Sequence, residues 1–274
     1  MEERLSKGWR LAVLLSSTVG MPWSAAGTAK AEEVQRIQLS GTPGAYAIAD
    51  WKQDWPQCAF ETGISEGRVE RVDRDGHRWL SVRYPEGSHG SGLGGAVWRM
   101  PLPGADRMEL RYTLQFEEGF DFNKGGKLPG LCGGPKTITG GDRVNGLEGF
   151  SVRLMWRKEG RGQAYVYHMD QPGKYGNEFD FPEAFRFPIG RDIAIRIEVT
   201  INRPGEKDGQ IRVWTTLGNE SEQLQLDQTG LRFRATPSYA IDGLLFNTFH
   251  GGSDASWAPR RDCRAQFGGF EVRR

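Results

Sequence analysis

Two short segments near the middle of the chain place basic and phenolic side chains at two-residue spacing. They read Phe-Ser-Val-Arg-Leu-Met-Trp-Arg at 150–157 and Gln-Ala-Tyr-Val-Tyr-His at 163–168, with a Gly-containing turn between them. Two alternating runs around such a turn are typical of a β-hairpin. Neighbouring side chains on a strand point to opposite faces, so every second residue shares a surface. The residues predicted to share surfaces in this way are Ser151, Arg153, Met155 and Arg157 on the first strand, and Tyr165 and Tyr167 on the second.

If the hairpin loop closes symmetrically, Arg153 lies opposite Tyr167 and Met155 lies opposite Tyr165. A guanidinium and two phenols then gather on one face of the hairpin. Positive charge beside proton-donating hydroxyls suits the recognition of a sugar acid. Ordinary cross-strand packing on a solvated face is the alternative interpretation of the hairpin taken alone.

A lysine between glycines lies upstream, in Gly-Gly-Lys-Leu-Pro-Gly-Leu-Cys-Gly-Gly at 125–134. The glycines permit another backbone to approach Lys127 closely. The segment does not match the phosphate-binding pattern G-x-x-x-x-G-K-[ST], and Pro129 argues against a helix that opens onto a phosphate. Taken alone, the segment predicts a glycine loop that carries a solvated lysine.

Five segments resemble, in the same order, those of the family 14 polysaccharide lyases, the alginate-lyase group, and their fungal and bacterial relatives. The segments are GGKLPGL (125–131), FSVRLMWR (150–157), AYVY (164–167), INRPGEKDGQIRVW (201–214) and FHGGSDASWAP (249–259). The resemblance implies a β-jelly roll whose concave face binds an acidic polysaccharide. The catalytic residues that it implies are Lys127, Ser151, Arg153, Tyr165 and Tyr167.

The same residue types suit the β-elimination of a 4-linked uronate. The reaction removes a weakly acidic proton from C5, and the neighbouring carboxylate repels the negative charge that develops, so a cation must neutralise this carboxylate. We predict that Arg153 and Lys127 do so, the first as a bidentate partner and the second as a point charge. A base must reach C5 and an acid must reach O4, and a tyrosine beside cations can fill either role. The symmetric register favours Tyr167 as the base, while Ser151 orients the substrate or a tyrosine.

Three further residues are candidate substrate contacts: Arg157, His250 and His89. Arg157 continues the hairpin surface, and the two histidines lie in Phe-His-Gly-Gly and Gly-Ser-His-Gly. Histidines in such loops can equally hydrogen-bond only to nearby backbone. We expect Asp254 and Trp257 to brace the last loop. The four histidines are scattered and no cysteine pair has C-x-x-C spacing, so neither a metal site nor a cofactor is predicted.

Two other classes of function fit parts of the sequence. Glu178, Asp180 and Glu183 match E-x-D-x-x-E, the acid motif of family 16 glycoside hydrolases, which use a related jelly roll. Retaining hydrolysis needs two carboxyl groups about 5 to 5.5 Å apart, but Pro182 favours a loop here over the required central strand. A sandwich of this kind can also bind sugars without chemistry. The joint presence of Lys, Ser, Arg and two Tyr favours catalysis.

Short alternating segments separated by turn residues recur from about residue 68 to the end of the chain. No stretch offers ten or more residues of helical period. The segment 171–188 contains three prolines and no period, and we expect it to be a long loop over one face. The pattern predicts an all-β fold, a β-jelly roll or concanavalin A-like sandwich of two antiparallel sheets.

The start of the chain is of a different kind. Basic residues, the apolar run 11–15 and the triplet Ala29-Lys30-Ala31 follow the order of a secretory signal peptide that is cleaved after Ala31. The apolar run is well short of the roughly 20 residues that a membrane span needs. We therefore expect a secreted or periplasmic protein built from a signal peptide (1–31), an N-terminal tether (32–48) and one jelly-roll domain (49–274).

Charge and cysteine content limit the possible partners. The chain has 36 Lys+Arg and 35 Asp+Glu, which gives no global field to attract nucleic acid or an anionic membrane. An acidic polysaccharide must therefore be held by a local patch, and we expect a monomer without membrane contact after cleavage of the signal peptide. Three cysteines (Cys58, Cys132 and Cys263) allow at most one internal disulfide. We favour Cys58–Cys263, because first and last strands often neighbour each other in sandwiches.

Overall fold

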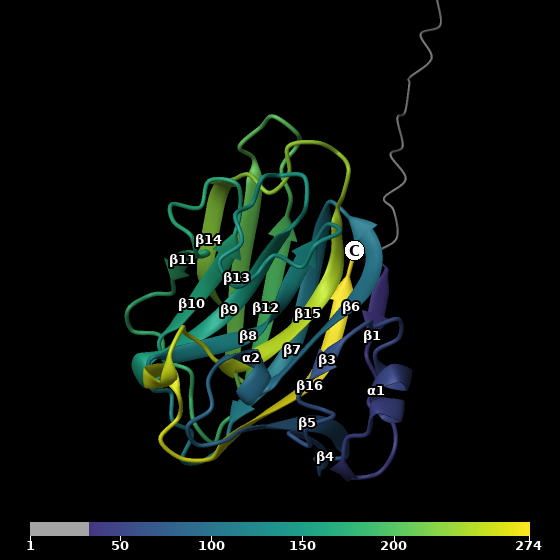
Figure 1. The fold of residues 1–274 in the computed structure, drawn as a ribbon, viewed down its shortest axis with the longest axis vertical. Helices are drawn as coiled ribbons and strands as arrows, with labels where there is room; N and C mark the ends of the chain where they lie inside the picture. The colour runs from purple at the N-terminus through teal and green to yellow at the C-terminus, as the bar shows by residue number, and fades with distance from the viewer. Residues whose placement is uncertain (1–32) are drawn as a thin grey trace, which may run out of the picture. The chain divides into compact units, whose positions relative to one another are not determined.

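The computed structural model describes residues 33–274, so the predicted signal peptide lies outside the described residues. The described chain forms two antiparallel sheets that pack against each other (Figure 1). Helical structure is limited to α1 (Ile48–Asp54), α2 (Gly90–Leu93) and 3₁₀ turns at Lys158–Gly160 and Ala255–Trp257. No helix in this range is both long and apolar enough to cross a membrane. The predicted all-β sandwich is confirmed.

One sheet has nine strands. Its members are β1 (Val34–Arg36), β2 (Gly44–Ala45), β4 (Val69–Arg74), β5 (His77–Tyr84), β7 (Arg107–Phe116), β12 (Ile193–Thr200), β13 (Gly209–Leu217), β14 (Gln223–Leu231) and β16 (Cys263–Arg273). They run in the order β14-β13-β12-β7-β16-β5-β4-β2, and β1 pairs with β16 beside this path. The last strand of the chain therefore lies in the interior of this sheet.

The other sheet has seven strands. Its members are β3 (Glu61–Thr62), β6 (Ala96–Ala105), β8 (Gly125–Gly133), β9 (Phe150–Arg157), β10 (Gly162–Tyr167), β11 (Asn177–Asp180) and β15 (Ile241–His250). Their order is β11-β10-β9-β8-β15-β6-β3. The hairpin of β9 and β10 and the glycine-rich strand β8 are neighbours in this sheet, which brings together the segments that sequence analysis singled out.

The core lies between the two sheets and follows the strand alternation. On β7, Met108, Leu110 and every second residue after them are buried, and on β12 Ile193, Ile195 and their alternates are buried in the same way. Apolar side chains at period two can be removed from water only against a second layer, which explains the sandwich. The opposite face of the nine-stranded sheet carries paired charges, including an ion pair between Arg196 and Glu109 at 3.2 Å.

The segment 32–48, predicted to be a tether, belongs to the fold from residue 33 onward. Val34 of β1 pairs with Arg273 of β16, and β2 pairs with β4. Tyr46 is buried, and its hydroxyl donates a hydrogen bond to Asp54 of α1 at 2.8 Å. Strands of two and three residues are too short to produce a visible alternation, so the sequence pattern missed them.

The segment 171–188, predicted to be a continuous loop, contains the edge strand β11. Tyr165 of β10 pairs with Glu178 of β11 in this register. Four residues at a sheet edge carry little apolar signal, because only one neighbouring strand covers them.

The predicted Cys58–Cys263 disulfide is wrong, because Cys58, Cys132 and Cys263 are all free thiols. The first and last strands do neighbour each other, but β1 pairs with the far end of β16, near Arg273. Cys58 precedes β3 of the seven-stranded sheet, whereas Cys263 opens β16 of the nine-stranded sheet. The two cysteines therefore lie next to strands of different sheets.

Candidate active site

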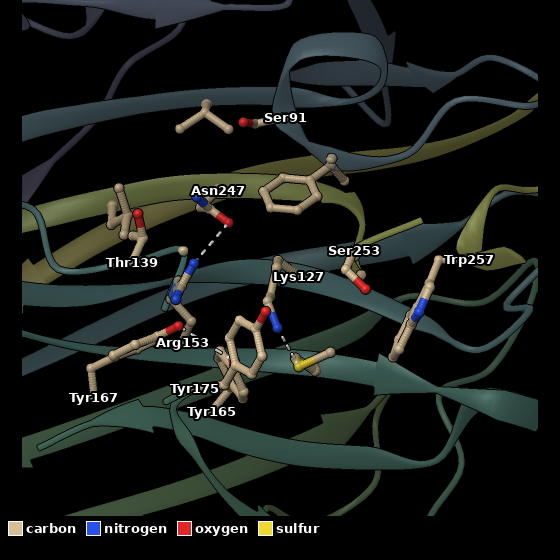
Figure 2. Close-up of a pocket in the computed structure, with 18 of the residues that line it drawn as sticks. Ser91, Lys127, Thr139, Arg153, Tyr165, Tyr167, Tyr175, Asn247, Ser253 and Trp257 are labelled. Atoms are coloured by element: carbon tan, nitrogen blue, oxygen red, sulfur yellow. Dashed lines mark hydrogen bonds between the residues drawn. The ribbon is translucent and has the colours of Figure 1, made fainter. Parts of the chain in front are cut away.

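A cavity of about 640 Å³ lies over the seven-stranded sheet, on the face that is turned away from the core (Figure 2). Four neighbouring strands supply its floor. The polar residues that they contribute are Lys127 from β8, Arg153 and Arg157 from β9, Tyr165 and Tyr167 from β10, and Asn247 from β15. Loop residues 137–140 and 251–257 contribute to its walls. The structure thus brings together five of the eight predicted site residues.

Lys127 lies on β8, a strand that needs glycine at Gly126 because Trp156 of the neighbouring strand packs closely against it. Gly126 lies opposite Trp156 of β9, and a Cβ atom on Gly126 would overlap the indole ring. A β-bulge between Leu128 and Gly130 accommodates Pro129, which cannot donate a ladder hydrogen bond. The segment taken alone predicted a glycine loop with a solvated lysine, and this interpretation is wrong, since residues 125–133 form β8 and Lys127 is only 9% exposed.

The β9–β10 hairpin closes two residues more tightly than the symmetric register predicts. Arg153 lies opposite Tyr165, and Tyr167 lies opposite Ser151. The connection is the short turn Lys158–Gly160, in which Glu159 (φ 62°) and Gly160 (φ 75°) adopt left-handed backbone. A shift of two residues leaves every side chain on its predicted face but changes its cross-strand neighbour.

Arg153 is a buried guanidinium with few partners. It is 2% exposed, its Nη1 donates to Oδ1 of Asn247 at 3.4 Å, and its Nε and Nη2 have no hydrogen-bond partner. The rings of Tyr165 and Tyr167 lie 5.5 and 5.6 Å from the guanidinium carbon. Burial lowers the pKa of Arg153. Unsatisfied donors on a buried charge are costly, which marks this position as prepared for a ligand.

Lys127 adds a second buried cation to the same cavity. Its Nζ lies 2.7 Å from Sδ of Met155, a weak acceptor, and 3.4 Å from the ring centre of Tyr165. Burial, together with the charge of Arg153, lowers the pKa of Lys127 well below its usual range. Within residues 33–274, no carboxylate forms a salt bridge with either Lys127 or Arg153. An anionic ligand would supply the missing countercharge.

The two tyrosine hydroxyls lie beside these cations. The phenol oxygens of Tyr165 and Tyr167 are 3.5 Å apart. Each also accepts a backbone hydrogen bond, from Gly176 N–H to Tyr165 at 3.2 Å and from Gly141 N–H to Tyr167 at 3.0 Å. Burial raises the pKa of Tyr165, and Arg153 opposes this shift. The cavity therefore combines two cations with two groups that can exchange protons.

Three predicted site residues lie away from the cavity lining. Ser151 is fully buried, and its hydroxyl donates to the Ile138 carbonyl at 2.7 Å, so it holds a wall loop. His250 faces the core, where its ring packs against Trp156, so its predicted contact with substrate is wrong. His89 directly precedes α2, and it does not line the cavity, although the adjacent Gly90 does.

Burial of His250 predicts an acid-sensitive fold. Its Nε2 donates to the Asp121 carbonyl at 2.6 Å, and burial lowers the pKa of His250 to about 4. As pH falls below about 6.5, His250 becomes protonated in the unfolded chain but stays neutral in the folded protein. Proton binding therefore favours the unfolded state, and the free energy of unfolding decreases. Between pH 7 and pH 4 we expect the wild-type free energy of unfolding to fall by about 3 kcal/mol more than that of His250→Phe. Urea denaturation at both pH values measures this, and equal slopes with pH would contradict it.

Sequence analysis missed several lining residues. Asn247, which contacts Arg153, alternates along β15 with core residues, and Trp257 lies at the opposite end of the cavity from Tyr167 (Figure 2). The ring of Trp257 lies 5.3 Å from the Arg157 guanidinium carbon. Trp257 was expected only to brace its loop. A polar amide within the otherwise mostly apolar strand β15 is the signal that could have found Asn247.

The hydrolase motif is not assembled as a pair of carboxylates. Glu178 is the only acidic residue among the described residues that line the cavity, and it forms a 3.7 Å ion pair with Arg157. β11 ends at Asp180, and Glu183 lies exposed beyond it. Glycoside hydrolysis of this type needs two carboxyl groups in one site. The geometry argues against this class of enzyme.

Comparison with known proteins decides the family. The model of the family described as Polysaccharide lyase 14 matches residues 72–270, most of the chain. The chain belongs to polysaccharide lyase family 14. It is therefore a polysaccharide lyase, and the resemblance seen in the sequence motifs is confirmed. A search of curated protein sequences found no match.

Solved structures of alginate lyases share the fold. A PL-14 alginate lyase from Aplysia kurodai is 29% identical, with a TM-score of 0.76, over 87% of this chain and 98% of that one. The alginate lyase Aly36B is 26% identical, with a TM-score of 0.74, over 88% of this chain and 96% of that one. Mutants of Aly36B have been solved in complex with an alginate trisaccharide and an alginate tetrasaccharide.

Proposed function

We propose that this polysaccharide lyase cleaves a 4-linked polyuronate, of alginate or glucuronan type, by β-elimination in the cavity of the seven-stranded sheet. The observation that carries the proposal is the pair of buried cations, Lys127 and Arg153, that have no carboxylate partner among the described residues. A uronate carboxylate has the charge and the acceptor geometry that these donors lack. The complexes of Aly36B with alginate oligosaccharides support the choice of substrate class.

Neutralisation of the substrate carboxylate is the first step. The Nε and Nη2 groups of Arg153 can donate to both carboxylate oxygens, while Lys127 supplies a second positive charge. Asn247 accepts from the remaining Nη1 and so orients the guanidinium. Withdrawing charge from the carboxylate makes the C5 proton more acidic, and fixed charges do this without reorganisation.

Proton transfer involves the two tyrosines. The observed register sets Arg153 against Tyr165, and the ammonium of Lys127 lies over the Tyr165 ring, so we assign the base to Tyr165 rather than to Tyr167. Its phenolate takes the proton from C5, the C–H electron pair forms the C4–C5 double bond, and the C4–O4 bond breaks. The hydroxyl of Tyr167 donates a proton to the departing O4.

The products test the proposed reaction. Alginate and glucuronan incubated with the protein should give new non-reducing ends that carry a C4–C5 double bond, seen as a rise in ultraviolet absorbance and as unsaturated oligosaccharides in mass spectrometry. Glu178→Gln should still give these products, because elimination does not use this acid. Saturated products that disappear in Glu178→Gln would instead show a hydrolase. Polymer binding without any cleavage would show a binding module.

A further inference from the structure

Each catalytic phenol is held by a backbone amide from a separate loop. The loop before β9 (134–149) carries Gly141, whose N–H donates to Tyr167, and the loop after β10 (168–176) carries Gly176, whose N–H donates to Tyr165. An N–H aimed at a phenol oxygen favours the phenolate over the phenol. It also occupies one acceptor site, which limits the directions in which the hydroxyl proton can point.

One buried side chain ties these two loops together. The Nε2 group of Gln171 donates to the Asp142 carbonyl of the first loop at 3.1 Å, and to the carbonyls of Gly173 and Lys174 in its own loop at 3.2 and 3.3 Å. Gln171 is 5% exposed. The loops also touch beside Gly141, where an added Cβ atom would come within 2.9 Å of Cε of Lys174. Gln171 therefore links the segments that carry the two amide donors.

We propose that Gln171 is a positioning residue for the elimination, which keeps both glycine N–H groups aimed at the hydroxyls of Tyr165 and Tyr167. The inference rests on the proposed function of these tyrosines. Gln171 acts through the loops, because it does not line the cavity. Loss of its amide lets the loops separate, so the phenolate loses hydrogen bonds that help to form it.

The strand-borne charges near the tyrosines are held independently of Gln171. The charged side chains that line the cavity with the tyrosines all come from strands: Lys127 on β8, Arg153 and Arg157 on β9, and Glu178 on β11. The other charged residues of β11 and the two loops are Asp180, Lys136, Asp142, Arg143, Glu148, Asp170 and Lys174. Glu178 pairs with Arg157, and the Asp142 carboxylate pairs with Lys136 at 2.8 Å. A change at Gln171 therefore alters the amide donors while the strand-borne charges stay in place.

Gln171→Met tests the inference, since methionine keeps the length of the side chain and removes its donor. We expect kcat on polyuronate to fall about tenfold, with KM little changed because the cations remain. The rise of kcat with pH should move to higher pH, since the phenolate is less stabilised. Steady-state kinetics across the pH range measure all three quantities. An unchanged kcat with an unchanged pH profile would overturn the inference.

Asn145→Ala is the matched control. Its side-chain oxygen accepts from Leu147 and Glu148 N–H within the same loop, without reaching the other loop. This variant should keep the wild-type kcat and pH profile, and the same loss in both variants would show a general loop effect and overturn the inference. If Gln171→Met does not fold, Gln171→Leu, which also removes the donor and adds no charge, is measured in its place.

Failure of the proposed function can be separated from failure of this inference. If the wild-type protein cleaves no polyuronate, the elimination is disproved. The phenolate absorbance of Tyr165 is then measured by ultraviolet titration as the difference between each protein and its Tyr165→Phe counterpart. Ionisation at higher pH in Gln171→Met than in wild type would retain the positioning role, and identical titrations would remove it.

Discussion

Replacing Arg153 with methionine is expected to lower kcat/KM on polyuronate by at least about a hundredfold, as the loss of one preorganised charge in a buried site does. The same substitution should raise the free energy of unfolding of the unliganded protein by about 1 kcal/mol or more. The reason is that the guanidinium is buried with two unsatisfied donor groups and no carboxylate partner among residues 33–274. Activity assays and urea denaturation measure the two effects.

Arg157→Met is the control for Arg153→Met. Arg157 lies on the same strand face but is more exposed, and it is paired with Glu178. Its loss should act mainly on KM and should not stabilise the fold. A variant Arg153→Met with wild-type turnover, or with a fold less stable than wild type, would refute the assignment of Arg153 as the carboxylate partner.

Tyr165→Phe is expected to abolish nearly all turnover, by about a thousandfold or more, because it removes the base and leaves the ring in place. Folding and polymer binding should persist, since the ring still lies under Lys127 and beside Arg153. In the wild type, kcat should rise with pH as the phenol ionises. The rise should level off once Lys127 loses its proton, which happens at a lower pH than for an ordinary amine because burial lowers the pKa of Lys127.

Tyr167→Phe distinguishes the base from the acid. It should slow the departure of O4 but keep the rise of kcat with pH, because that rise belongs to Tyr165. The pH profiles of the two phenylalanine variants on one polymer provide the measurement. If Tyr167→Phe loses the rise and Tyr165→Phe keeps it, the base is the residue that the symmetric hairpin register predicts.

The face of each site residue on the β9–β10 hairpin could be predicted from the sequence, but not its partner. Alternation alone fixes which side chains share a surface, and a two-residue shift preserves it. The register depends on the left-handed backbone of Glu159 in the turn, and glutamate gives no sign of that conformation. This one turn explains why Arg153 lies opposite Tyr165 and not opposite Tyr167, as the symmetric register predicted.

β15 shows why His250 was misplaced and Asn247 was missed. The strand is apolar on both faces, with Leu244 and Phe246 toward the core and Leu245 toward the cavity. Such a strand lacks the polar and apolar alternation that would tell which face is which. The strand β8 was not predicted for a related reason, because its glycines resemble a loop until Trp156 is placed against Gly126.

The order of the strands has a consequence for how the protein folds. β15 and β16, the last strands of the chain, lie in the interior of the two sheets, where β15 separates β8 from β6 and β16 separates β7 from β5. Neither sheet can be completed until β15 and β16 are available. Each of these strands pairs with strands far away in the sequence, and such long-range pairing is expected to make folding slow. During synthesis the strands already made expose unpaired edges until β15 and β16 have been added.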